Sequence, residues 1–501
     1  MNTRKIGWNA TIAIIQVIAS AVTLVILYKY ILDVLGIGSL GIWSVVLAIT
    51  SLSNIGQFGL SGSVIKFVAK YLARNEFEKV EQVLKTAFSA VSVILFFSLI
   101  VIYYPSVWIL GEIIPEDSLE IAISLLPFAL ASMWLGSVSS IFLSGLDGCQ
   151  RVDVRSLIMI LAVLLFTVLA INLIPKYGLI GLAYAQILQN IFILITGWLF
   201  IRKELSILTL LPIGWNYSLF IEMIRYGINF QIGTLAIMFL DPVTKMLMTK
   251  FGGLGATGFF EMANKMVLQF RAIIVAANQV LVPVIATMKE KELVGIKKVY
   301  IQSFNFVLIL TLMIYSFLIV ITPYVSEFWI GRYEPLFIFF SFMAILGWAF
   351  STLSVPAYFN NLGTGNLFWN TVAHIIIGII NISIGYLSGY FFGTTGVILS
   401  YVFAIIVGSL IIFIMYSKNN NISIFTLLKK DSMLMLMACS IGCILGMAPY
   451  YLIERVSNMH SSITLFSISI ALYLIPVLLA LKGNHQVINL KNIIHKKVDS
   501  H

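Results

Sequence analysis

The stretch that decides the fold is RYGINFQIGTLAIMFLDPVTKMLMTKFGGLGATGFFEMANKM, residues 225–266. It contains two apolar segments separated by a glycine-rich turn, and each segment extends to about the length that crosses a bilayer. The turn holds Gly253, Gly255 and Gly258, which supply positive φ angles and close helix approach. Charged side chains lie within both segments. The stretch therefore predicts a helical hairpin in a membrane, with charges at membrane depth.

The composition of the whole chain places it in lipid. Of 501 residues, 60% are hydrophobic and 10% are charged, a balance that would cover a water-soluble protein with apolar surface. Fourteen apolar stretches are long enough to span a bilayer, starting near residues 6, 40, 82, 119, 154, 178, 217, 255, 299, 334, 366, 394, 431 and 461. They are continuous rather than alternating, which excludes a β-barrel. We expect an all-α integral membrane protein with about 14 transmembrane helices.

The basic residues orient these helices. Most of the 31 Lys and Arg residues fall in short clusters on one side of the predicted spans, the side that carries both termini. The positive-inside rule makes that side cytoplasmic. Orientation also explains the net charge of +10 without a nucleic-acid partner. The first apolar run, after Arg4 and Lys5, is too long for a signal peptide and is expected to remain as the first span.

The glycine pattern recurs in the second half of the chain. Gly36, Gly38 and Gly41 match Gly253, Gly255 and Gly258 at a spacing of 217, and Gly148, Gly178 and Gly181 match Gly363, Gly393 and Gly396 at 215. The near-constant spacing indicates duplication. We expect six-helix bundles at 1–203 and 217–418, a cytoplasmic linker at 204–216, and helices 13 and 14 with a basic cytoplasmic tail at 419–501. Parallel repeats of this kind suit alternating access.

Two motifs have plainer explanations than cofactor or metal binding. The G-x-G-x-x-G spacing would need a preceding strand and a βαβ unit to bind a dinucleotide, and neither is predicted. Cys149, Cys439 and Cys443 lack the spacing of a metal site and are interpreted as packing residues. We therefore expect no cofactor and no metal.

Charged residues within the spans are the first functional candidates, because they are costly there. Asp241 and Lys245 are one turn apart and can pair, and Pro242 predicts a bend beside them. On the next span one arc gathers polar side chains that can line a wet cavity: Glu261, Asn264, Lys265, Arg271 and Asn278.

The cations among these residues predict a substrate-binding cavity. Lys245, Lys265 and Arg271, together with Lys29 near the outer end of the first span, would attract a pyrophosphate or an acidic sugar. The alternative is that Asp241 with Lys245 and Glu261 with Lys265 are structural ion pairs. Arg271 has no acidic residue three or four positions away, which favours a role in binding.

Neutral polar residues add two further hypotheses. Asn54 and Gln57 give the second span a polar face that would contact sugar hydroxyls or form ordinary interhelical hydrogen bonds. His374 would titrate near neutral pH and couple transport to protons, or it is a hydrogen-bonded packing residue. Asp241, Glu261 and His374 are thus candidates for ion coupling, to H⁺ or Na⁺, or for structural roles. The sequence contains no catalytic constellation and no large outer loop, so an enzyme is not expected.

The chain resembles the polysaccharide-unit flippases of the multidrug/oligosaccharidyl-lipid/polysaccharide (MOP) exporter superfamily. The opening stretch carries the family pattern in Tyr226 with Gly227, Asp241, Gly255 with Gly258, and Phe260 with Ala263 and Lys265. A second stretch, GIWSVVLAITSLSNIGQFGLSGSVIKFVAKYLARNEFEKV, residues 41–80, is similar to the family's second span and the loop after it.

The resemblance implies a V-shaped pair of six-helix bundles around a central cavity, in the bacterial inner membrane. The implied substrate is an undecaprenyl-pyrophosphate-linked oligosaccharide for O-antigen, capsule or a related surface glycan, with its tail among membrane lipids. The implied partners are the polymerase and glycosyltransferases of the same pathway. Alternatives are a multidrug exporter of the superfamily, for which we expect twelve spans and a more acidic cavity, a peptidoglycan-precursor flippase, and a non-transporting membrane scaffold.

Overall fold

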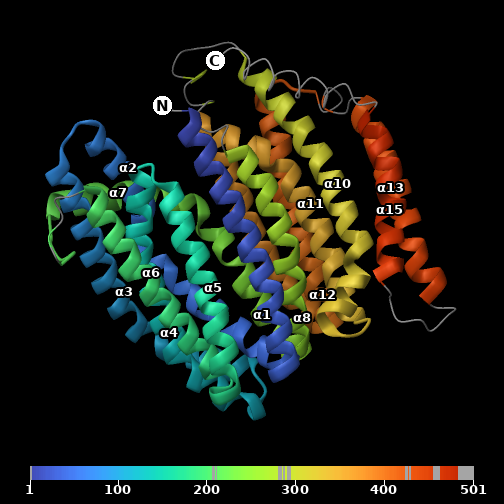
Figure 1. Cartoon of the computed structure of the whole chain (residues 1–501), viewed down its shortest axis with the longest axis horizontal. Coiled ribbons are helices and arrows are strands. Elements are labelled where there is room, and N and C mark those ends of the chain that lie inside the picture. Colours follow the sequence, from blue (N-terminus) through green and yellow to red (C-terminus); the bar gives the residue numbers. More distant parts are fainter. Residues whose placement is uncertain are drawn as a thin grey trace. The chain divides into compact units, whose positions relative to one another are not determined.

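The computed structural model describes residues 3–205, 209, 211–279, 285, 288–289, 295–423, 427, 430–454 and 463–482, and these contain helices and no strand. The elements, drawn in Figure 1, are α1 (Thr3–Ser51), η1 (Leu52–Gln57), α2 (Leu60–Ala73), α3 (Phe77–Ile113), α4 (Glu116–Gly148), α5 (Val152–Tyr177), α6 (Leu179–Leu205), α7 (Tyr217–Met238), α8 (Leu240–Gln279), α10 (Ile296–Ile330), α11 (Pro335–Thr364), α12 (Phe368–Asn419), α13 (Lys430–Pro449), the π-helix η3 (Tyr450–Glu454) and α15 (Ile463–Lys482). The all-α prediction is confirmed.

The described helices include ten segments long and apolar enough to cross a membrane, which confirms a multi-pass membrane protein. Two of the ten, Ile15–Gln57 and Phe368–Asn419, are about twice the length of a single span. The helices α7 and α8 are not among the ten. Acidic and basic side chains along α8, such as Asp241, Lys245 and Glu261, lower its hydropathy.

The double-length helices and α8 are hairpins that reverse at a glycine. In a straight helix, Lys245 and Glu261 would be about 24 Å apart, at 1.5 Å per residue. Instead the ammonium of Lys245 lies 2.8 Å from the Glu261 carboxylate, because Gly253 between them is non-helical. Gly36 breaks α1 and Gly393 breaks α12 in the same way. With these breaks, the chain has helical segments at all fourteen predicted spans.

One predicted span is interrupted. The stretch starting near 217 divides into α7 and α8 at Phe239, three residues before Pro242. Proline lacks the N–H that would bond to the carbonyl of Met238, four residues earlier, so the helix breaks in this turn rather than merely bending at Pro242.

The predicted duplication is visible in the backbone. Gly36 has φ 79° and ψ 168°, and Gly253, 217 residues later, has φ 77° and ψ 178°. Gly178 has φ 57° and ψ −137°, and Gly393, 215 residues later, has φ 60° and ψ −143°. These conformations are open to glycine and strained for other residues, which explains why the same residue type stands at matched positions.

Close helix approach explains a second pair of glycines. A Cβ added to Gly41 would lie 2.0 Å from the Leu254 carbonyl oxygen, and one added to Gly258 would lie 2.6 Å from that of Ile37. Adding 217 turns the first pair, 41 with 254, into the second, 258 with 37. The first and seventh hairpins therefore cross reciprocally about a local twofold axis, as an isologous interface does.

The chain divides into two compact units. Unit 1 comprises Met1–Met262 and Ile377–Ser400, and unit 2 comprises Ala263–Ile376 and Tyr401–His501. The division thus runs through α8 and α12, and the linker at 204–216 lies within unit 1. The two six-helix bundles at 1–203 and 217–418 stay a prediction.

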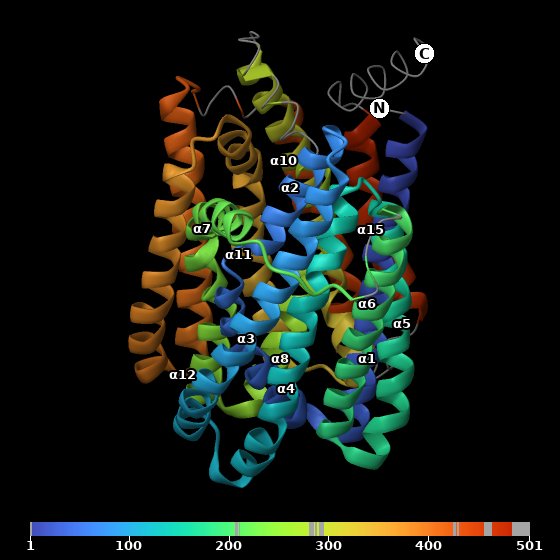
Figure 2. The ribbon, with the colours of Figure 1, turned by 90° about the vertical axis from the view of Figure 1, so that its left-hand side faces the viewer.

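Each unit has its own apolar core. In unit 1, α2, α3, α4 and α6 pack together (Figure 2) around side chains such as Val64, Leu84 and Phe142. In unit 2, α13 and α15 pack on α10, where the Tyr473 hydroxyl donates to the Met313 carbonyl at 2.7 Å. The last two helices are therefore an integral part of unit 2.

Candidate functional site

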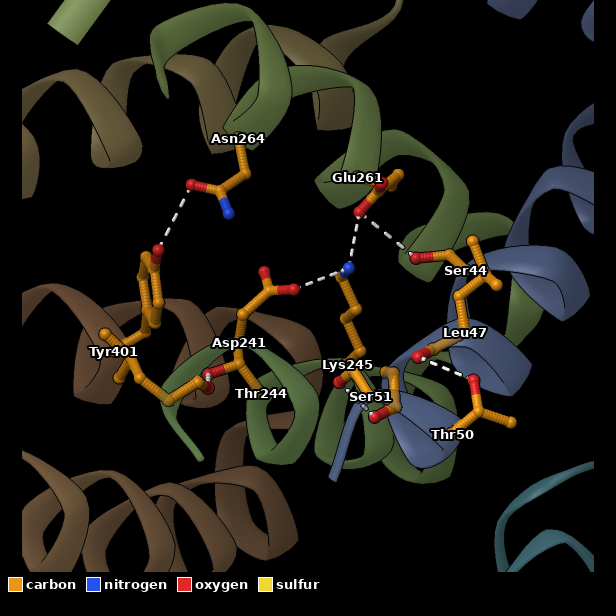
Figure 3. Close-up of polar contacts among 12 residues, drawn as sticks. Ser44, Leu47, Thr50, Ser51, Asp241, Thr244, Lys245, Glu261, Asn264 and Tyr401 are labelled. Carbon is orange, nitrogen blue, oxygen red and sulfur yellow. Dashed lines mark hydrogen bonds and ion pairs between the residues drawn. The ribbon is translucent and has the colours of Figure 1, made fainter. Parts of the chain in front are cut away.

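A buried ion network joins the two arms of the α8 hairpin in unit 1 (Figure 3). The Lys245 ammonium lies 2.6 Å from an Asp241 carboxylate oxygen and 2.8 Å from one of Glu261. From α1, the Tyr28 hydroxyl donates to Glu261 at 2.9 Å and the Ser44 hydroxyl donates at 3.1 Å. Lys245 and Glu261 are buried, whereas the Asp241 side chain is 40% exposed.

Packing against α12 holds the first turn of α8 in place. The Asn381 carboxamide of α12 donates to the Leu240 carbonyl at 3.2 Å and accepts from the Thr244 hydroxyl at 3.2 Å. These two bonds fix the backbone on either side of Asp241. The proline break after α7 and the Asn381 contacts together direct Asp241 and Lys245 toward the returning arm that carries Glu261.

The network changes the interpretation of Lys245. Its predicted pair with Asp241 is confirmed, but Glu261 contacts it as well, through a hairpin that helix spacing alone does not reveal. With two carboxylates within 2.8 Å, Lys245 is more than neutralised and the ionised triad carries one net negative charge. The expectation that Lys245 attracts a pyrophosphate is therefore wrong, because its charge is already used in this network.

Arg271, farther along α8 in unit 2, has a different environment. One guanidinium nitrogen donates to the Ser351 hydroxyl at 3.3 Å, and the guanidinium carbon lies 4.7 Å from the centre of the Trp348 ring. Its Nε is buried without a hydrogen-bond partner. Within the described residues its electrostatic neighbours are tyrosines and no carboxylate pairs with it. Arg271 thus keeps its full positive charge and open hydrogen-bonding capacity.

Two buried amides predicted to line the cavity hold helices together. The Asn264 side-chain oxygen accepts from the Trp348 indole at 2.9 Å and from the Tyr401 hydroxyl at 3.1 Å. The Asn278 oxygen accepts from Ser303 at 2.6 Å. Asn264 also positions Trp348, the ring on which Arg271 stacks, so it supports the Arg271 site indirectly.

The remaining predicted residues are dispersed. Lys29 forms a partly exposed pair with Asp33 at 3.6 Å, a kind of contact that contributes little. Lys265 is half-buried. His374 is buried with its ring 5.9 Å from that of Tyr358. The Asn54 side chain lies outside the described residues. The part of the chain that the structure describes holds no cluster of His, Cys, Asp and Glu suited to a metal ion.

A polar cavity in unit 1 was largely missed by sequence reasoning. It has a volume of about 390 Å³ and is lined by Leu47, Thr50, Ser51, Gln57, Ala129, Ser132, Met133, Gly136, Ser137, Gln186 and Asn190. Only Gln57 was predicted. A signal was present in Gln186 and Asn190, two carboxamides one turn apart on an otherwise apolar helix, but their meeting with α1 and α4 depends on tertiary packing.

Comparison with known families places the chain. Residues 3–289 match the model of the family described as polysaccharide biosynthesis protein. The chain belongs to this polysaccharide biosynthesis family. No curated protein matches the sequence.

Solved structures show which fold the family member adopts. An inward-facing multidrug resistance MATE family transporter of the MOP superfamily aligns with a TM-score of 0.68 at 16% identity, covering 80% of this chain and 94% of its own. The lipid II flippase MurJ in an inward closed conformation aligns with a TM-score of 0.68 at 14% identity, covering 97% and 99%. A MOP superfamily transporter from Pyrococcus furiosus aligns at 0.59 and 16%, covering 83% and 95%. The fold is that of MOP superfamily transporters.

Proposed function

We propose that this protein is a flippase that moves undecaprenyl-pyrophosphate-linked oligosaccharide units from the cytoplasmic to the outer leaflet of the bacterial inner membrane by alternating access. Membership of the polysaccharide biosynthesis family and the MOP fold support a transporter in glycan assembly. The excess of Lys and Arg on one side of the spans supports cytoplasmic termini. An enzyme is not proposed, because the chain offers no acid, base or nucleophile in a catalytic arrangement among the described residues.

The observation that carries the proposal is Arg271. A guanidinium without a carboxylate partner, enclosed by apolar and aromatic helices, is costly and is retained where it binds an anion. Its planar donors match phosphate oxygens, and stacking on Trp348 holds the plane in place. In the proposed mechanism Arg271 binds the pyrophosphate, while the polyprenyl tail stays in the bilayer.

The ion network of Asp241, Lys245 and Glu261 is the proposed coupling element. Its two carboxylates exceed its one ammonium, and the carboxylate of Asp241 is partly exposed. Uptake of one H⁺ or Na⁺ there would make the network neutral, and its release would restore the negative charge. Loading and unloading this site in the two orientations of the transporter would drive transport in one direction.

A second candidate is a peptidoglycan-precursor flippase. The observation that favours it is the alignment with the lipid II flippase MurJ, which covers 97% of this chain, against 80% for the MATE transporter. Both candidates move a polyprenyl-pyrophosphate-linked sugar, so the Arg271 role is common to them. A multidrug exporter would need an anionic site for cationic drugs, and Arg271 disfavours that reading.

The test uses Arg271→Ala in cells depleted of the native protein. We expect normal membrane insertion and a roughly tenfold or greater loss of surface glycan export, because one charge-assisted phosphate contact is removed. Arg271→Lys should recover only part of the activity, since it lacks the planar fork. The matched control is Arg332→Ala, an exposed arginine paired with Glu334. Full export by Arg271→Ala at normal protein levels would refute the assigned role.

A further inference from the structure

The polar cavity of unit 1 is chemically unlike the Arg271 site. Its lining includes three carboxamides, Gln57, Gln186 and Asn190, and four hydroxyl side chains, without a charged or aromatic residue. A site for phosphate would be expected to offer cations and one for a cationic drug would offer carboxylates. The lining therefore favours a neutral ligand with many hydrogen-bonding groups.

The cavity is built from four elements of unit 1. Thr50 lies on α1 and Gln57 ends η1, while Ser132 and Ser137 lie on α4 and Gln186 and Asn190 on α6. The Gln57 amide donates to the Ser137 hydroxyl at 2.7 Å, and the Asn190 amide donates to the Ser132 hydroxyl at 2.9 Å. These bonds fix two of the three carboxamides, so their geometry is set before a ligand arrives.

The third carboxamide has no protein partner. Gln186 makes no hydrogen bond to any described residue, and its side-chain oxygen is buried. Asn190 commits its amide nitrogen to Ser132, and its oxygen accepts no bond from the described residues. A buried amide that forms no hydrogen bond destabilises a fold. The two side chains, one turn apart on α6, therefore present free donors and acceptors to the same cavity.

We propose that this cavity is a subsite for an uncharged sugar residue of the lipid-linked substrate. A hydroxyl group both donates and accepts, as a carboxamide does, so a ring of amides and hydroxyls complements a sugar better than it complements an ion. The volume of about 390 Å³ falls in the range of small-ligand pockets, about 300–1,000 Å³. Leu47, Ala129 and Met133 supply the apolar wall against which the C–H face of a sugar packs.

This inference rests on the proposed function and assigns a separate task to unit 1. Arg271 recognises the pyrophosphate shared by all polyprenyl-linked substrates, and the cavity discriminates among the sugars attached to it. Gln186 is the residue most specific to this role, because it contributes no hydrogen bond to the fold. Replacing it should alter sugar recognition and leave the folded structure intact.

The experiment measures binding of two probes to the full-length protein in lipid nanodiscs: undecaprenyl pyrophosphate, and the same lipid carrying the host's oligosaccharide unit. The wild type should bind the glycosylated lipid more tightly. In Gln186→Met this preference should fall about tenfold, the effect of one or two lost hydrogen bonds, with the thermal unfolding midpoint equal or higher. Affinity for the bare lipid should not change.

Controls separate this inference from the flippase proposal. Asn172→Leu replaces an exposed carboxamide on α5 outside the cavity and should keep the preference. Arg271→Ala should weaken both probes equally. If Gln186→Met keeps the full preference, the cavity holds water or lipid and the sugar subsite is refuted while the flippase stands. If the wild type binds neither probe, the flippase proposal fails as well.

Discussion

Lys245 shows how a single charge can stabilise a buried site that it does not open to substrate. It is 5% exposed and lies between two carboxylates, of which Glu261 is 6% exposed. Taking one partner from a buried ion network leaves the other uncompensated, and this is more costly than removing both. The network therefore has a stability signature that distinguishes it from the Arg271 site.

We expect Lys245→Met to destabilise the protein by about 3 kcal/mol, because Glu261 would remain charged and buried without its counter-ion. Adding Glu261→Gln should recover part of the loss, since the buried charge is then removed. The measurement is the thermal unfolding midpoint in detergent. Lys29→Met, at a partly exposed pair, is the control and should change stability by less than about 1 kcal/mol. Equal midpoints for Lys245→Met and wild type would contradict the account.

Cys149, directly after α4, should react slowly with thiol reagents. Burial raises the pKa of its thiol to about 12, and the nearby Glu204 carboxylate adds to the rise. Below that pH the thiol stays protonated, and the thiolate is the reactive form. With Cys439 and Cys443 replaced by Ala, maleimide labelling at pH 7.5 should be far slower than for Glu78→Cys, an exposed position. Equal labelling rates would show that Cys149 is not shielded.

At the scale of elements, the crossing of the first and seventh hairpins depends on Gly41 and Gly258. Each faces a backbone carbonyl of the other hairpin at a distance no Cβ can occupy. Glycine at both positions thus allows the helices to approach closely, as small residues do where helices pack in membranes. The 217-residue spacing found in the sequence is the spacing of this reciprocal contact.

Gly41→Ala should impair folding, because its Cβ would lie 2.0 Å from the Leu254 carbonyl oxygen and the hairpins would have to separate. Gly258→Ala should act similarly, at 2.6 Å from Ile37. Gly38→Ala is the matched control, since its Cβ meets nothing within 4 Å and alanine favours a helix by about 1 kcal/mol. Folded yield in the membrane and the unfolding midpoint are the readouts. A normal midpoint for Gly41→Ala would disprove the close crossing.

Element existence was largely predictable, whereas the pairing of side chains was not. Continuous apolar runs reveal spans, and the paired glycines Gly36 and Gly253 reveal where hairpins reverse. Helical periodicity identified Asp241 with Lys245 because the two residues are one turn apart. It could not bring Glu261 to them, since that contact requires the turn at Gly253 to fold one arm onto the other. The cavity around Gln186 was missed for the same reason.

At the scale of the whole molecule, the two units offer different chemistry to one proposed substrate. Unit 1 contains a neutral hydrogen-bonding cavity and a net-negative ion network, and unit 2 contains Arg271 with an open guanidinium. A pyrophosphate-linked glycan combines an anionic group with neutral sugars, so both kinds of site are useful to the same transporter. The appended helices α13 and α15, packed on α10, add to unit 2 and leave these sites unchanged in composition.

The most direct measurement of the central claim is depletion of the protein in its native bacterium, followed by quantification of surface polysaccharide and of undecaprenyl-pyrophosphate-linked units. The account predicts loss of surface glycan with accumulation of completed lipid-linked oligosaccharide. Accumulation of the peptidoglycan precursor instead would favour the second candidate. An unchanged lipid-linked pool together with increased sensitivity to cationic drugs would contradict the account and identify an exporter.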